Sequence, residues 1–145
     1  MSEFLASGVD SIVGRLTQAT TRPLQEVTAE QIEAWKEEVN LLSNAVCGKE
    51  STWHVLLEYP IPRRGKRIDA VLLTPDVVLV IEFKCGAAQY DRDARLQVED
   101  YCLDLRDFHA ESYDRPLVPI LVATDAEDQP YPTDRSEEHT SELQS

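Results

Sequence analysis

The stretch that decides the fold is Lys66–Lys84, which reads KRIDAVLLTPDVVLVIEFK. Two apolar runs, Arg67–Leu73 and Val77–Phe83, flank a Thr-Pro-Asp turn. Apolar runs on either side of such a turn are typical of a β-hairpin. Pro75 excludes the positive φ that a two-residue type I′ turn needs, so we expect a loop from Thr74 to Val77 around a type I turn.

This loop length fixes which residues of the hairpin face each other. Leu73 then lies opposite Val78, and Asp69 lies opposite Glu82. Opposed side chains of an antiparallel pair have Cβ atoms about 4.5–5.5 Å apart, and Lys84 shares the face of Glu82 because alternate residues point the same way. Two carboxylates that close repel each other unless a cation or a proton lies between them. The alternative is a sheet edge whose charges neutralise one another.

Composition restricts the class of protein. The chain has 145 residues, of which 42% are hydrophobic and 28% charged, as in an ordinary single-domain globular protein. It has no apolar run of the ~20 residues that span a bilayer, and its start lacks a signal-peptide pattern. Cys47, Cys85 and Cys102 form no CxxC pair, so we expect neither a disulfide framework nor a zinc site. A cytoplasmic protein without a membrane partner fits best.

Positive charge is concentrated in one place. The net charge of −13 argues against wholesale electrostatic capture of nucleic acid. The basic segment, however, places Arg63, Arg64, Lys66 and Arg67 directly before Asp69. It reads either as a solvated strand tip or as a rim that binds phosphate. In the hairpin register Arg67 faces Lys84, which favours an anion between them, unless Arg67 pairs with Glu82 or Asp69 instead.

The remaining periodicities predict a mixed α/β domain. A marginal amphipathic helix is expected over Ser2–Ala19. Thr28 and Gln31 form a capping-box pattern that starts a helix ending at Cys47, with Glu38 beside its apolar stripe. The further elements expected are a strand over Thr52–Ile61 with its odd-numbered residues on one face, the hairpin, a helix over Tyr90–His109 and a doubly buried strand over Leu117–Thr124. The order is helix, three strands, helix, strand, with the last helix crossing over to a parallel strand in a mixed sheet.

Three parts are expected along the chain: an N-terminal helix and linker over 1–27, the main domain over 28–134, and a tail over 135–145. The tail reads RSEEHTSELQS, which resembles the in-frame translation of a sequencing-library adapter. We therefore treat it as non-native. The expectation is that the native reading frame ends near Asp134 and that the natural protein is longer.

Three motifs carry a resemblance to a known family. They are Gly65-Lys-Arg-Ile-Asp69, Glu82-Phe-Lys84, and Gln97-Val-Glu-Asp-Tyr101, in which Gln97 and Tyr101 share one helix face. In this order, on a strand, a strand and a helix, they resemble the PD-(D/E)xK nuclease superfamily in its RecB-type QxxxY branch. The resemblance implies a restriction-endonuclease-like core.

The resemblance also implies a chemistry and a set of roles. A Mg²⁺ or Mn²⁺ ion would be held by Asp69, Glu82 and the backbone carbonyl of Phe83, with help from Glu38. Lys84 would orient the attacking water and stabilise charge on the scissile phosphate. The Gln-Tyr pair would position the nucleic-acid backbone or order the site. Clustered oxygen ligands suit hard divalent ions, which activate water and offset charge on a phosphate.

A closer resemblance concerns the context of the domain. The segments IPRRGKRIDAVLL, IEFKCG, QVEDYCLDLRDFH and RPLVPILVAT resemble the N-terminal domain of bacterial Schlafen-type DNA/RNA helicase proteins. This implies nucleic acid, DNA in the first place, as partner and an attached helicase or ATPase domain downstream. The chain contains no GxxxxGK[ST] phosphate loop, so any ATP would bind in that further domain. The alternatives are a non-catalytic docking module and a fragment without independent activity.

Overall fold

The computed structural model describes residues 1–20, 26–48, 52–61, 64–108 and 114–127. Arg63 and the expected tail over 135–145 lie outside these residues. In chain order the elements are α1 (Ser2–Ala6), α2 (Val9–Thr20), α3 (Ala29–Val46), β1 (His54–Pro60), β2 (Arg67–Leu73), β3 (Val78–Lys84), α4 (Arg92–Phe108) and β4 (Leu117–Ala123).

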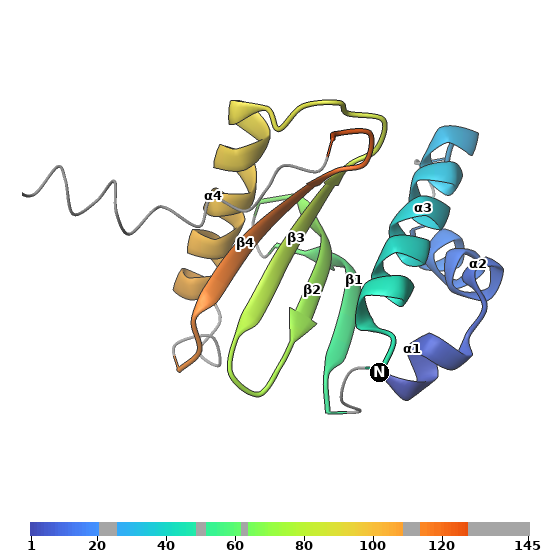
Figure 1. Ribbon diagram of the computed structural model, residues 1–145, viewed down its shortest axis with the longest axis horizontal. Coiled ribbons are helices and arrows are strands. Elements are labelled where there is room, and N and C mark those ends of the chain that lie inside the picture. Colours follow the sequence, from blue (N-terminus) through green and yellow to red (C-terminus); the bar gives the residue numbers. More distant parts are fainter. Residues whose placement is uncertain (21–25, 49–51, 62–63, 109–113, 128–145) are drawn as a thin grey trace, which may run out of the picture.

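One mixed sheet organises the molecule. Its four strands lie in the order β1-β2-β3-β4. The first three are antiparallel neighbours, and β4 runs parallel to β3 after the crossover through α4. Figure 1 shows α4 on one side of this sheet and α1, α2 and α3 on the other. The expected mixed α/β class and element order are therefore confirmed.

The hairpin has the predicted register. Leu73 pairs with Val78 and Ala70 pairs with Ile81. The next pair in this register is Asp69 opposite Glu82. The loop between the strands has the predicted length, and Thr74 closes it by accepting from the backbone N–H of Val77 at 3.0 Å and donating to its carbonyl at 2.8 Å.

Each face of the sheet carries its own apolar core. The α4-side cluster joins both hairpin strands to α4 through Ile61, Ile68, Val71, Val78, Val80, Val98, Tyr101, Cys102 and Leu105. The α3-side cluster joins the same strands to α3 through Leu42, Val46, Ala70, Leu72, Ile81 and Phe83. Residues of β2 and β3 thus alternate between two buried faces, as a central hairpin requires.

The N-terminal helices follow the predicted pattern with one change. Thr28 caps α3 by accepting from the N–H of Gln31 at 3.2 Å. The predicted stripe of α3 is buried at Trp35, Val39, Leu42 and Val46. The single helix expected over Ser2–Ala19 is instead two, because Ser7 has extended backbone and ends α1.

The expected alternation of β1 is wrong beyond Leu57. Val55 and Leu57 pack on the α3-side cluster, but Tyr59 and Ile61 belong to the α4-side cluster. The cause is Glu58, which has a φ of 49° and turns the following residues to the other face. Ile68, the partner of Tyr59, follows it onto the α4 side.

The double burial expected for the last strand is also wrong. β4 is the final strand in the sheet order, so among the described residues its outer edge has no neighbour. Val118 and Pro119 are exposed, and Leu121 and Val122 are half-buried. In the part of the chain that is described, no helix is long and apolar enough to cross a membrane.

Candidate functional site

The first feature of the site is a contact between β2 and β3. The backbone ladder between these strands ends at the pair Ala70 and Ile81. Beyond it the side chain of Asp69 accepts from the backbone N–H of Phe83 at 2.8 Å. Because a strand residue uses its N–H and C=O on the same side in an antiparallel pair, the Phe83 carbonyl is directed toward β2 as well.

The two hairpin carboxyl groups meet as the register predicts. Burial, followed by the charge of the neighbouring Glu82, raises the pKa of Asp69 to about 7. The Phe83 N–H and the Lys84 ammonium act in the opposite direction. Without a bound metal ion Asp69 therefore keeps its proton to a higher pH than an ordinary aspartate does.

Glu82 is the most enclosed of the site carboxylates. Its side chain is 7% exposed, and its Oε1 accepts from Lys84 Nζ at 3.2 Å. Its Oε2 is buried and has no hydrogen-bond partner within the described residues. A buried carboxylate oxygen that lacks a partner costs about 1–3 kcal/mol or more, so this atom marks a place where a ligand would be stabilised.

Lys84 is held by the QxxxY pair. Its Nζ donates to Gln97 Oε1 at 3.1 Å, and the Gln97 amide donates in turn to the hydroxyl of Tyr101. Tyr101 is buried in the α4-side cluster. Of the two roles predicted for the pair, this geometry favours ordering the site, because Gln97 and Tyr101 fix the position of the ammonium.

Glu38 reaches the same place from the opposite layer. It lies on α3 and is 7% exposed. Burial raises its pKa to about 9, with further contributions from the charges of Asp69, Glu58, Glu82 and Glu37. The structure thus brings the predicted third carboxylate close enough to the hairpin pair for their charges to interact.

A fourth carboxylate, Glu58, was not predicted. Its strand neighbours pair with Ala70 and Ile68, so Glu58 lies opposite Asp69. Its Oε1 accepts from the indole Nε1–H of Trp35 at 2.9 Å, and burial raises its pKa. Strand alternation assigned Glu58 to an outer face, and only its positive φ, which the sequence does not signal, turns it to the site.

The basic segment divides between two partners. Arg64 forms an ion pair with the buried Asp104 of α4 at 3.0 Å. Arg67 lies 4.0 Å from Glu58 and donates to Thr20 Oγ1 at 3.3 Å. The predicted opposition of Arg67 and Lys84 is therefore wrong: the reversal of strand faces at Glu58 directs Arg67 toward the α3 layer. Lys66 is exposed and has no ion pair with any described residue.

The site offers oxygen ligands but not a finished metal centre. Among the residues that the structure describes, no three His, Cys, Asp or Glu side chains are arranged to hold a metal ion. The donor chemistry nevertheless fits a hard divalent ion, because the Asp69 and Glu82 carboxyl groups are neighbours and Glu82 Oε2 has no partner in the described part of the chain. No protein-family model, curated protein or solved structure matches the chain.

Proposed function

We propose that this protein is a nuclease domain with a restriction-endonuclease-like core, which hydrolyses phosphodiester bonds of nucleic acid, DNA in the first place, with Mg²⁺ or Mn²⁺. The observation that carries the proposal is the buried Oε2 of Glu82, which lies beside a second carboxyl group and has no hydrogen-bond partner among the described residues. A divalent cation would pair with that oxygen and would replace the proton on Asp69.

The side chains have separate roles in this proposal. Asp69, Glu82 and the Phe83 carbonyl would hold the ion, with Glu38 behind them. The ion supplies an activated water and offsets charge on the phosphate. Lys84 uses two of its donors on Glu82 and Gln97, which leaves a third donor for a phosphate oxygen or the attacking water. Gln97 and Tyr101 keep that ammonium in place.

One observation favours a second function, that of a non-catalytic docking module. The Lys84 ammonium already pairs with Glu82 at 3.2 Å, and the raised pKa of Asp69 favours the neutral form of that carboxyl group. The cluster can therefore neutralise itself without a metal. The attached helicase or ATPase domain is a proposal that rests on the family resemblance alone. The cytoplasmic location is a proposal that rests on the cysteine spacing and on the start of the sequence.

The experiment that separates these functions combines cleavage with metal binding. Labelled single-stranded and duplex oligonucleotides are incubated with the protein in Mg²⁺, in Mn²⁺ and in EDTA, and Mg²⁺ binding is measured by calorimetry. We expect Lys84→Ala to keep Mg²⁺ binding and to lower turnover by roughly 10²–10³-fold, the size of loss typical of one charge-stabilising donor. Asp69→Asn should weaken Mg²⁺ binding.

Two matched controls accompany these variants. Lys36→Ala removes an ammonium that pairs with Glu33 on the surface of α3, and Asp76→Asn removes an exposed carboxylate of the hairpin loop. Both should behave like the unchanged protein. Cleavage that persists in EDTA, or Mg²⁺ binding that Asp69→Asn leaves unaltered, would reject the nuclease proposal. Binding of oligonucleotide without cleavage in any metal would favour the docking module.

A further inference from the structure

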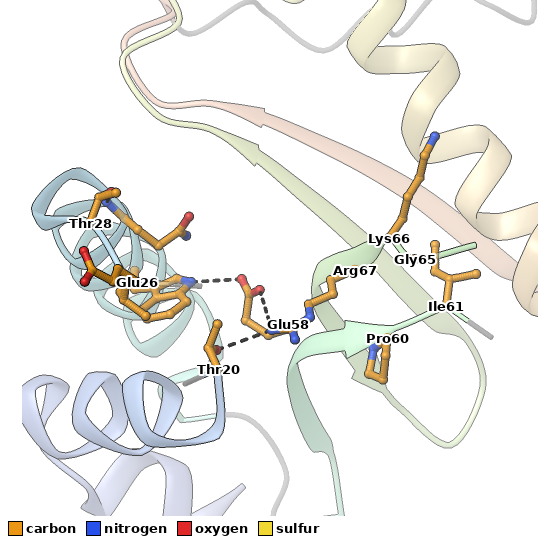
Figure 2. Close-up of a pocket in the computed structure, with 12 residues that line it drawn as sticks. Thr20, Glu26, Thr28, Glu58, Pro60, Ile61, Gly65, Lys66 and Arg67 are labelled. Carbon is orange, nitrogen blue, oxygen red and sulfur yellow. Dashed lines mark hydrogen bonds and ion pairs between the residues drawn. The ribbon is translucent and has the colours of Figure 1, made fainter. Parts of the chain in front are cut away.

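A polar cavity of about 660 Å³ lies between the start of α3 and the paired ends of β1 and β2. Its walls include Thr20, Thr28, Trp35, Glu58 and Arg67. Glu58 and Arg67 face each other in it, while Lys66 extends away from them (Figure 2). Since Glu58 lies opposite Asp69 in the sheet, the cavity adjoins the candidate active site.

The cationic side of the cavity is Arg67, whose donors are poorly used. Its side chain is 30% exposed, so most of the guanidinium is removed from bulk water. A guanidinium has five N–H donors, yet among the described residues the Arg67 guanidinium contacts Thr20 Oγ1 at 3.3 Å and Glu58 Oε2 at 4.0 Å and forms no shorter bond. Charge-assisted hydrogen bonds of this kind usually measure about 2.7–2.9 Å. Arg67 therefore has donors to offer to an anion in the cavity.

The acceptor side of the cavity is Glu58, which is held in one place. The Trp35 indole fixes Oε1 at 2.9 Å, and within the described residues Oε2 has only the long contact with Arg67 at 4.0 Å. The backbone φ of 49° is costly for a residue other than glycine, and strain of this kind collects at ligand sites. Oε2 is thus positioned to accept from a hydroxyl or amine group next to the anion on Arg67.

An anion beside a hydrogen-bond donor is the pattern of a nucleotide, and the cavity has the size of a small-molecule site, about 300–1,000 Å³. We propose that this cavity binds one nucleotide of the substrate strand, with its phosphate on Arg67 and a sugar hydroxyl or base amine on Glu58. The proposal rests on the proposed nuclease function for its biological meaning. The chemical class of the ligand is inferred from the residues of the cavity alone.

The test uses deoxyadenosine 5′-monophosphate, deoxyadenosine and inorganic phosphate as separate probes, titrated into the 145-residue protein in EDTA. We expect the monophosphate to bind one to one and more tightly than either of the other two. Arg67→Ala should weaken its binding by roughly tenfold or more, since the charge-assisted contact with the phosphate is lost. Arg95→Ala, which removes an exposed arginine of α4, should change nothing.

Two conservative variants keep the test decisive if Arg67→Ala fails to fold. Arg67→Lys preserves the charge but not the planar fork, and should weaken monophosphate binding several-fold. Glu58→Gln preserves an acceptor for Trp35 and removes the charge that competes for Arg67. It should strengthen the binding of inorganic phosphate, which a purely structural Glu58 would not do.

The outcomes distinguish this proposal from the proposed function. Monophosphate binding in EDTA without any metal-dependent cleavage would support the cavity and reject the nuclease. Metal-dependent cleavage without monophosphate binding, or with equal affinity in Arg67→Ala, would overturn the cavity proposal and leave the nuclease standing. Equal affinity for the monophosphate and for inorganic phosphate would also overturn it, because the nucleoside would then make no contact.

Discussion

The backbone N–H of Phe83 donates to the side chain of Asp69 at 2.8 Å, so a side chain takes the place of a backbone acceptor where the β2–β3 ladder ends. This bond keeps one Asp69 oxygen occupied and leaves the carboxyl group against Glu82. Burial, followed by the charge of Glu82, makes the ionised form of Asp69 costly and raises its pKa to about 7. The raised pKa of Asp69 leads to the first two predictions.

The first prediction concerns the stability of the metal-free protein against pH. The pKa of Asp69 rises from its ordinary value of 3.8 to about 7 on folding. The folded state thus keeps a proton that the unfolded state has lost, so the free energy of unfolding falls as pH rises between these values. Asp69→Asn should flatten this fall and stabilise the protein near pH 8 by about 1–2 kcal/mol. Urea unfolding in EDTA at a series of pH values measures this free energy of unfolding for both proteins.

The control for this prediction is Asp76→Asn, in the exposed hairpin loop, which should follow the unchanged protein at every pH. Near pH 4, where Asp69 is protonated in the folded state, Asp69→Asn should no longer be stabilising. An equal shift of Asp69→Asn at all pH values would show that the substitution acts through packing and not through charge.

The second prediction is that divalent cations reverse this loss of stability. A metal that binds only the folded state stabilises it by about 2.7 kcal/mol at a hundred times its Kd. Mg²⁺ should therefore raise Tm more near pH 8 than near pH 5, because protons compete for Asp69 and for Glu38, whose pKa is raised to about 9. Binding should release protons, which calorimetry in two buffers detects. No Tm gain in the unchanged protein would contradict a metal site here.

Local patterns in the sequence predict the frame of this protein well. The Pro75 turn fixes the loop length, and loop length fixes the register that brings Asp69 toward Glu82. The Thr28 capping box predicts the start of α3. Each of these is settled by residues near one another in the chain, so the sequence alone carries the information.

The features that the sequence does not predict depend on distant partners. The positive φ of Glu58 accompanies a hydrogen bond to Trp35 on another element. Arg64 could face solvent or phosphate by its sequence context, and its choice of Asp104 depends on how α4 lies on the sheet. The exposure of β4 depends on its place at the end of the sheet. The motifs therefore predict which residues lie near the site, but not which partner each side chain contacts.

The third prediction compares two glycine-to-alanine substitutions that should change the stability of the protein in opposite directions. Gly86, next to the end of β3, has a φ of 77° and donates its N–H to Thr124 at 2.8 Å. Gly86→Ala should destabilise the protein by about 1–2 kcal/mol, the cost of a left-handed conformation with a Cβ. Gly14 lies inside α2, where a Cβ would have open space, so Gly14→Ala should stabilise by about 0.5–1 kcal/mol. Thermal unfolding of both variants measures the difference.

The fourth prediction concerns Arg64, one of two arginines of the basic segment that form an ion pair in the described structure, and its contribution to stability. Arg64 pairs with Asp104, whose side chain is 7% exposed. Arg64→Ala leaves that carboxylate buried without its partner and should cost about 1–3 kcal/mol of stability. The double variant Arg64→Ala with Asp104→Asn should recover part of the loss, as urea unfolding of the complete double-mutant cycle would show.

The fifth prediction is that Arg67, and not Arg64, contributes to the binding of nucleic acid. Arg64 is engaged by its own carboxylate, whereas Arg67 has donors to offer. Each phosphate contact adds about 0.9 to the slope of log K against log salt on duplex DNA. Arg67→Ala should therefore reduce the salt slope of oligonucleotide binding by about one unit, and Arg64→Ala should leave it unchanged despite its lower stability. A reduced slope in Arg64→Ala with an unchanged slope in Arg67→Ala would reverse the assignment and make Arg64 the residue that contacts phosphate.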